Sequence, residues 1–275
     1  KNFSIKKIGH AGTLDPLAQG VLPVALGKAT KLIPFINNNL KTYNFNVTWG
    51  TQTSTDDSEG KIIFSSTKIP TLKEIKIKIK NFEGFIDQVP PKVSAVKING
   101  QRAYKLARNK INFNILPKKV FVKNLSLIKH ENNRTSFEIE CGKGFYIRSF
   151  ARDLGISLQT YGHISSLERT KVGKFNKDSS ILLDDLIKIG QRLNGINCIM
   201  PSISMLDDIL AVEVVDQKSL NDLSFGRSIK VDEKMLKNFQ LISSDKKIVF
   251  LSNKGNIVSI GKLIGNLFKP NKILI

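Results

Sequence analysis

Asp15 is the first candidate for chemistry, because it is an isolated carboxylate among small and apolar residues in a strongly basic chain. The surrounding stretch, residues 9–31, reads GHAGTLDPLAQGVLPVALGKATK. Pro16 disfavours helical backbone at the residue before it, so we expect Asp15 on an extended or turn segment. Glycines on both sides permit another segment to approach closely. From this stretch alone, a structural role in an Asx turn or a helix cap is favoured over a catalytic one.

A second stretch, CGKGFYIRSFARDLG at residues 141–155, contains groups that suit a carboxylate partner and a flat ligand. Its apolar residues fall on one face of a helix that is predicted to start near Tyr146. Arg148 can pair bidentately with a carboxylate and hold it ionised, and Tyr146 can stack on a planar ring. A surface arginine and a core tyrosine explain these two residues equally well when they are taken alone.

Two further stretches are basic but less specific. VPPKVSAVKINGQRAYKLAR, residues 89–108, predicts an Asn-Gly turn followed by a helix that carries Lys105 and Arg108. Phosphate contact suits this helix, although charged helix residues more often form a solvated face. In ISSLERTKVGKF, residues 164–175, basic residues flank Leu167, and one such run among many basic residues indicates little by itself.

The charge balance points to a polyanionic partner. The 275 residues include 43 Lys and Arg against 23 Asp and Glu, which gives a formal net charge of +20. Each phosphate that such a chain neutralises releases condensed counterions. The chain has no apolar run long enough to span a bilayer, and its basic residues are not gathered on one amphipathic helix, so a membrane role is disfavoured. Cys141 and Cys198 lack metal-site spacing, which predicts a reducing, cytoplasmic environment and no structural metal.

The hydrophobic periodicity predicts an α+β fold. Alternating apolar residues indicate a strand over 43–50, followed by a polar loop at 51–60 that forms the long, mobile tip of a hairpin. Thr71 and Glu74 form a capping box ahead of a predicted helix, and residues 120–130 and 135–141 predict a second hairpin. From about residue 196, short apolar runs broken by Asn, Gly, Ser and Lys predict a small β module.

Taken together and in this order, five blocks of the chain resemble the bacterial tRNA pseudouridine-55 synthases, the TruB family. They are the block around Asp15, KTY at 41–43, the block at 89–108, the block at 141–155, and LERTKVGKF at 167–175. The resemblance implies the pseudouridine synthase fold, a mixed, mainly antiparallel sheet with flanking helices, over residues 1–195. It also implies a small RNA-binding module of the PUA type over residues 196–275.

The family's activity sets the expected reaction and its site. By resemblance, the chain isomerises one uridine in the TΨC loop of tRNA, position 55, to pseudouridine. The resemblance implies a monomer that works without metal, cofactor or obligate protein partner. Asp15, from GTLD, would be the catalytic carboxylate, Arg148, from YIR, its salt-bridge partner, and Tyr43, from KTY, would lie against the uracil face. Attack on the sugar, attack on the base and deprotonation of the sugar all remain open as routes.

The resemblance also implies four substrate-binding residues. Tyr146 would be the second aromatic residue beside the base, and Leu167 would be an apolar wall of its pocket. His10 would insert into the RNA loop and help hold the flipped-out bases, because an enzyme that acts on a base must take it out of the stack. Lys31, from ATK, would bind the RNA backbone.

The chain departs from the family's pattern at three places. Members open with a strand and loop of the type LDKPxGxTS, whereas this chain begins at KNFSIKKIGHAG, which predicts a missing N-terminal strand and an exposed sheet edge. Lys92 and Val93 replace an apolar residue and a tyrosine, and GHAG replaces GHTG.

Two other functions compete with the enzyme. A non-catalytic tRNA-binding or tRNA-folding protein on the same scaffold would make Asp15 dispensable, and the intact set of site residues argues against it. A guide-dependent relative would be expected to carry long extensions for its partner proteins, which this sequence lacks.

Overall fold

A computed structural model of the chain describes residues 5–36, 39–189, 199–206, 211–214, 216–231 and 248–275. The chain divides into two compact units, which we describe separately. The sheet unit comprises residues 13–22 and 38–177, and the module unit comprises residues 1–12, 23–37 and 178–275. The predicted boundary between residues 195 and 196 lies outside the described residues, so a division at that point stays a prediction.

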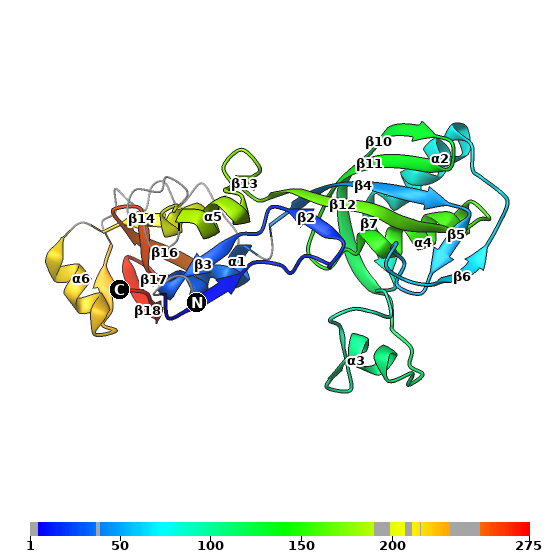
Figure 1. Cartoon of the computed structure of the whole chain (residues 1–275). Coiled ribbons are helices and arrows are strands. Elements are labelled where there is room, and N and C mark those ends of the chain that lie inside the picture. Colours follow the sequence, from blue (N-terminus) through cyan, green and yellow to red (C-terminus); the bar gives the residue numbers. More distant parts are fainter. Residues whose placement is uncertain (1–4, 37–38, 190–198, 207–210, 215, 232–247) are drawn as a thin grey trace. The chain divides into compact units, whose positions relative to one another are not determined.

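The sheet unit is built on a sheet that has seven strands among the described residues (Figure 1). Six strands follow the order β13-β12-β4-β11-β10-β7 with antiparallel neighbours, and β2 pairs with β12 in parallel. The expected α+β class with a mixed, mainly antiparallel sheet is therefore confirmed. The strands are β2 (Ala18–Gly20), β4 (Lys41–Trp49), β7 (Gly84–Gln88), β10 (Lys118–Glu131), β11 (Arg134–Cys141), β12 (Gly162–Val172) and β13 (Phe175–Asn176).

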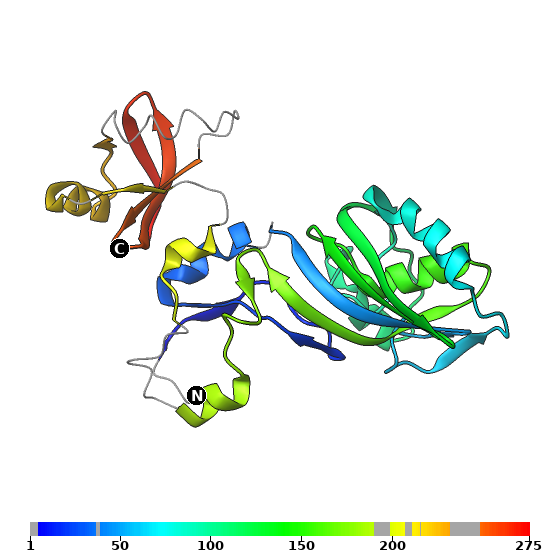
Figure 2. The same cartoon turned by 90° about the horizontal axis from the view of Figure 1, so that it is seen from above.

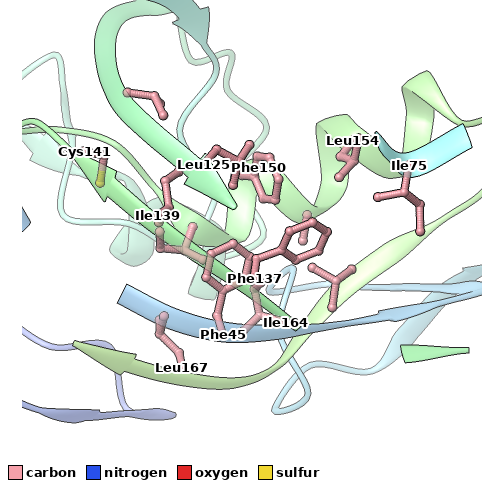
Figure 3. Packing of buried hydrophobic residues seen from close by; sticks show 14 of the residues in the cluster. Phe45, Ile75, Leu125, Phe137, Ile139, Cys141, Phe150, Leu154, Ile164 and Leu167 are labelled. Atoms are coloured by element: carbon pink, nitrogen blue, oxygen red, sulfur yellow. The ribbon is translucent and has the colours of Figure 1, made fainter. Parts of the chain in front are cut away.

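One face of this sheet forms the core against two helical segments. They are α4 (Ile147–Ser157) and α2 (Leu72–Lys78), which continues into η2 (Ile79–Phe82). Figure 3 shows Phe150 of α4 beside Phe45 and Phe137 of the sheet, and the Phe45 and Phe137 rings are stacked with centroids 5.4 Å apart. Because strand residues alternate between faces, every second residue of β4 from Phe45 onward is buried here.

Two predicted helix starts are confirmed. The Thr71 hydroxyl accepts the amide N–H of Glu74 at 3.3 Å, and the Glu74 carboxylate accepts the amide N–H of Thr71 at 2.7 Å, so the capping box begins α2 as expected. Tyr146 has extended backbone and precedes the first residue of α4. In both cases the local sequence is sufficient to fix where the helix begins.

The hairpin after β4 has a packed tip, unlike the mobile tip that we expected. A hairpin is present, but β6 (Ile62–Ser65) pairs with β5 (Thr51–Thr53), which lies within the residues expected to be loop, and not with β4. Between them, Asp56 and Asp57 are buried, and the amide N–H of Ile164 in β12 donates to the Asp56 carbonyl at 3.0 Å. The polar loop was misread because the contacts that bury it, with α4 and β12, come from residues more than 90 positions away in the sequence.

The segment between β7 and β10 leaves the sheet (Figure 1). It holds the hairpin of β8 (Lys97–Ile98) and β9 (Gln101–Arg102), followed by α3 (Ala103–Arg108). The predicted Asn-Gly turn is confirmed, because Asn99 and Gly100 have φ values of 47° and 83°, which a two-residue hairpin turn of this kind requires.

The module unit contains a second sheet of order β14-β16-β17-β18-β15 (Figure 2). Its core includes Leu251, Phe268 and Leu223, so the expected small C-terminal β module is confirmed. The described elements are β1 (Ile8–His10), β3 (Val24–Leu26), η1 (Gly27–Leu32), α1 (Ile33–Ile36), α5 (Leu183–Ile189), η3 (Ser202–Met205), β14 (Ala211–Glu213), α6 (Gln217–Ser224), β15 (Ile229–Lys230), β16 (Ile248–Asn253), β17 (Asn256–Ile264) and β18 (Leu267–Ile273). No helix in the described ranges is long and apolar enough to cross a membrane.

Gly20 allows β2 to lie against β12, and its replacement is predicted to destabilise the sheet unit. Its φ is +106°, and an added Cβ would lie 2.2 Å from the carbonyl oxygen of Arg169. Gly20→Ala should therefore lower the free energy of unfolding by about 2 kcal/mol or more, measured by urea titration. Gly84→Ala is the matched control, since Gly84 also has a positive φ but open space around it. Equal losses in the two variants would show that the close approach is not required.

Candidate active site

Asp15 and Arg148 form a bidentate ion pair in the sheet unit. Nε of Arg148 donates to Oδ2 of Asp15 at 2.8 Å, and Nη2 donates to Oδ1 at 3.0 Å. The arginine side chain is only 6% exposed, whereas that of the aspartate is 35% exposed. Asp15 lies on the extended loop before β2, and Arg148 lies in the first turn of α4. The pair therefore holds an accessible carboxylate in one orientation on a buried cation.

The rest of the Arg148 guanidinium is held by two other loops. Nη1 donates to the carbonyl oxygen of Thr55 at 3.0 Å and to that of Val93 at 3.2 Å. The buried carboxylate of Asp57 lies 3.7 Å from Nε. Since Val93 contributes its backbone oxygen, the family's usual tyrosine side chain is not needed for this contact. Arg148 thus connects the Asp15 loop with the 51–60 loop and the segment after β7.

Tyr43 lies opposite Arg169 in the pairing of β4 with β12. The pKa of the Tyr43 phenol is raised to about 12, chiefly by burial; the negative charge of Asp15 acts in the same direction, and Arg169 opposes it by its charge and a hydrogen bond. Arg169 is 1% exposed, and its Nε donates to the carbonyl oxygen of Val21 at 2.8 Å. This buried arginine of β12 therefore connects the residues after β2 with the strand that pairs with β4, opposite Tyr43.

The raised pKa of Tyr43 predicts a late step in the alkaline titration. The folded state holds the phenol proton more tightly than the unfolded chain, whose ordinary pKa is about 10. The resulting stabilisation is full below pH 10 and is lost as the pH rises through about 12. Tyrosinate absorbance at 295 nm should show one phenol ionising near pH 12. Tyr43→Phe should remove that step, whereas Tyr104→Phe, at an exposed position, should retain it. A late step that persists in Tyr43→Phe would contradict its assignment to Tyr43.

Tyr146 is fixed by its backbone at the start of α4. The side chain of Gln88 accepts the Tyr146 amide N–H at 2.8 Å and donates to its carbonyl oxygen at 3.1 Å. Burial raises the pKa of the Tyr146 phenol, and the charge of Asp15 adds to that shift. The negative charge of Asp15 therefore acts in the same direction on the pKa of both phenols.

The other predicted site residues lie in different surroundings. Leu167 is buried in the core of the sheet unit, opposite Ala18 in the pairing of β12 with β2. It therefore lies beside β2, the strand that follows the Asp15 loop. His10, in β1, is exposed, and Lys31, in η1, donates to the carbonyl oxygen of Ile273. Both belong to the module unit, so their relation to Asp15 stays a prediction.

Three residues that position the site were not singled out from the sequence. Asp57 lies in the loop that we expected to be mobile, and Arg169 lies in a basic run that we treated as unspecific. Gln88 has no sequence signal that we recognise, because an exposed polar residue at the end of a strand would look the same. Their roles depend on contacts between distant segments, namely with Arg148, Val21 and Tyr146.

A cavity of about 760 Å³ adjoins the Arg148 anchor at Val93. Its lining combines basic and aromatic side chains, which suits phosphate and base contacts together. These are Lys92, Arg108, Lys110, Tyr104 and Phe113. Asp15 does not line this cavity. Among the described residues, no group of three or more His, Cys, Asp or Glu side chains is placed to hold a metal ion.

Comparisons with known proteins agree on one family. Residues 1–147 match the model for the TruB family pseudouridylate synthase, N-terminal domain. The chain is 40% identical over 282 residues to tRNA pseudouridine synthase B of Ehrlichia chaffeensis. This alignment covers 99% of this chain and 91% of that protein. It is 52% identical over 188 residues to the protein of the same name from Wolbachia pipientis. That alignment covers 68% of this chain and only 53% of the relative's length.

Solved structures show the same fold. The chain in a Cbf5-Nop10-Gar1 complex aligns with a TM-score of 0.68 and 23% identity over 98% of this chain and 77% of that one. A chain of an H/ACA RNP bound to a substrate RNA containing 2'-deoxyuridine aligns with a TM-score of 0.70 and 21% identity, with the same coverage. At these identities the likeness supports the fold alone.

Proposed function

Since the chain belongs to the TruB family of pseudouridylate synthases, we propose that it isomerises uridine 55 in the TΨC loop of tRNA, with Asp15 as the catalytic carboxylate. The observation that carries this proposal is the bidentate pair, in which a solvent-accessible carboxylate is fixed on a buried guanidinium. Because its other side is open, the carboxylate can contact a nucleotide while it stays paired with Arg148. The relatives named tRNA pseudouridine synthase B support the choice of tRNA as substrate.

The proposed reaction is an isomerisation that needs no other reactant. The bond between N1 of uracil and C1′ of ribose breaks, the base turns over, and C5 bonds to C1′. The hydrogen at C5 leaves as a proton, and N1 takes up a proton, so substrate and product have the same atoms. The nucleotide must leave the base stack for a side chain to reach both sugar and base.

Asp15 can serve this reaction by any of the three routes that the sequence left open. It can attack C1′, as the nucleophilic carboxylate of a retaining glycosidase does, attack the ring, or remove a proton from the sugar. Each route needs the carboxylate at a fixed position against the nucleotide. The two guanidinium contacts supply that position, and the carbonyl oxygens of Thr55 and Val93 fix the guanidinium in turn.

Tyr43 and Tyr146 are proposed to hold the base. Both phenols have raised pKa values and stay neutral near pH 7, so they present aromatic rings without adding charge beside Asp15. Stacking on such rings offsets the stacking that a flipped base loses, about 1 to 3 kcal/mol per base. Leu167 supports this pocket from the core as an apolar wall that helps keep water from the intermediate.

The basic surface is proposed to bind the tRNA backbone. The net charge of +20 and the basic cavity beside Val93 suit a phosphate-rich T arm. We assign His10 to the flipped-out bases and Lys31 to the backbone. We further propose that residues 1–195 form the catalytic domain and residues 196–275 an RNA-binding module, and that the protein acts as a monomer in the cytoplasm, where tRNA is its partner.

Release of tritium from C5 of uridine tests this function. A T-arm stem-loop RNA labelled at C5 should lose one equivalent of tritium to water when the chain is added without metal or cofactor. An otherwise identical RNA with cytidine in place of uridine 55 should lose none. If the chain binds both RNAs and releases no tritium, it is a tRNA-binding protein rather than an isomerase.

A further inference from the structure

Arg152 lies one helical turn after Arg148 in α4, and it does not contact Asp15. Residues four apart share one face of a helix, so both guanidinium groups lie on the same side of α4. The Arg152 side chain is 16% exposed. Its Nη1 lies 3.2 Å from a carboxylate oxygen of Asp56, and its Nη2 donates to the carbonyl oxygen of Val89 at 2.7 Å. Its Nε pairs with the neighbouring Asp153 at 2.8 Å.

The first of these partners lies in the loop that holds Arg148. Asp56 stands between Thr55, whose carbonyl oxygen accepts Nη1 of Arg148, and Asp57, whose carboxylate lies near Nε. Asp56 has a φ of 60°, which L-residues adopt at an energetic cost, so its conformation depends on surrounding contacts. Its second carboxylate oxygen accepts the Gln52 side chain at 3.1 Å. Arg152 is the charged partner that fixes this turn.

The second partner lies in the other segment that holds Arg148. Val89 directly follows Gln88, which fixes Tyr146, and precedes Val93, whose carbonyl oxygen accepts Nη1 of Arg148. The Ser149 hydroxyl also donates to the Val89 carbonyl oxygen, at 2.7 Å. Loss of Arg152 would leave this segment the Ser149 bond at Val89 and the Arg148 bond at Val93. The 51–60 loop would lose the ion pair of Asp56 with α4 and keep the Arg148 contacts of its neighbours. The effect of the loss should fall mainly on the loop.

We propose that Arg152 is a positioning residue, which clamps the 51–60 loop and the segment after β7 to α4 and so sets the geometry of Arg148 against Asp15. This inference rests on the proposed isomerase function for its rate measurement. An exposed ion pair would contribute little, but this one is largely buried and bridges the two segments that supply the carbonyl acceptors of Arg148. A displacement of about 1 Å at a reacting group can cost about 10²-fold in rate.

Single-turnover tritium release with saturating enzyme separates positioning from RNA binding. Arg152→Met should lower the rate constant about 10- to 100-fold, while the Kd for the T-arm RNA stays within about twofold. Arg152→Lys should recover part of the rate, because an ammonium can pair with Asp56 but cannot also reach Val89. Asp56→Asn should slow the reaction as well, and combining it with Arg152→Met should add little further loss. Lys123→Met, which removes an exposed cation paired with Glu140, should match the wild type.

The Nε–H signal of Arg148 in a nitrogen-15 spectrum tests the clamp without any activity. It should shift or broaden in Arg152→Met and stay unchanged in Lys123→Met, with thermal melting used to show that each variant is folded. If Arg152→Met does not fold, Arg152→Lys and Asp56→Asn carry the same test. An unchanged rate and Arg148 signal, or a loss confined to RNA affinity, would overturn the proposal. If the wild type releases no tritium, the proposed function fails, whereas the spectrum still decides on the clamp.

Discussion

Asp15→Asn should abolish pseudouridine formation while the variant still binds RNA. The amide keeps the shape of the side chain but cannot act as a nucleophile or a base, so the single-turnover rate should fall about 10³-fold or more. Affinity for the T-arm RNA should be unchanged or slightly higher, because a negative charge is removed from a phosphate-binding surface. Tritium release and filter binding on the same RNA give both quantities.

Glu59→Gln is the matched control for this variant. Glu59 is exposed in the neighbouring 51–60 loop, and only its amide N–H contacts the site, at Asp57. The control removes the same charge from the same region and should keep the wild-type rate. Turnover by Asp15→Asn within tenfold of the wild type would remove Asp15 from the chemistry and favour the non-catalytic tRNA-binding function.

Arg148→Met should lose activity and stability together. The guanidinium is buried, and its removal leaves the buried carboxylate of Asp57 without this nearby cation. The carbonyl oxygens of Thr55 and Val93 also lose their hydrogen-bond donor. Breaking a buried ion pair from one side costs about 3 to 5 kcal/mol, so the free energy of unfolding should fall by about that amount. Asp15 also loses its orientation, so the rate should fall about 10²-fold or more at temperatures where the variant is folded.

Urea titration and single-turnover kinetics measure the two effects of Arg148→Met. Arg134→Met, at an exposed position in β11 of the same unit, should change neither. Arg148→Lys retains a charge but loses the planar two-donor geometry, so it should recover stability more than rate. A fully stable, inactive Arg148→Met would show that the guanidinium contributes to the chemistry without holding the loops.

Features that depend on neighbouring residues could be predicted from the sequence. The Thr71–Glu74 capping box and the Asn-Gly turn at Asn99 are local hydrogen-bonding and backbone preferences, and both formed as expected. The α4 start after Tyr146 followed from helical periodicity. The pairing of Asp15 with Arg148, which joins residues 133 apart, was expected from motif order rather than from any local pattern.

Features that depend on distant contacts could not be predicted in this way. Asp56 and Asp57 have the sequence of a solvated turn, and only the contacts with α4 and β12 show that they are buried. Arg169 looked like one more surface cation, but its neighbours in β4 and after β2 enclose it. A buried charge needs partners from several segments, and composition alone does not reveal where they come from.

Nucleotide-resolution mapping of pseudouridine in a full-length tRNA transcript, after reaction with the wild-type chain or with Asp15→Asn, shows whether Asp15 performs the isomerisation. Carbodiimide adducts and primer extension should show one modified position, uridine 55, with the wild type and none with the variant, at equal RNA occupancy. The same modification with both proteins, or none with a wild-type chain that binds the tRNA, would contradict the claim that the Asp15 carboxylate held by Arg148 performs the isomerisation.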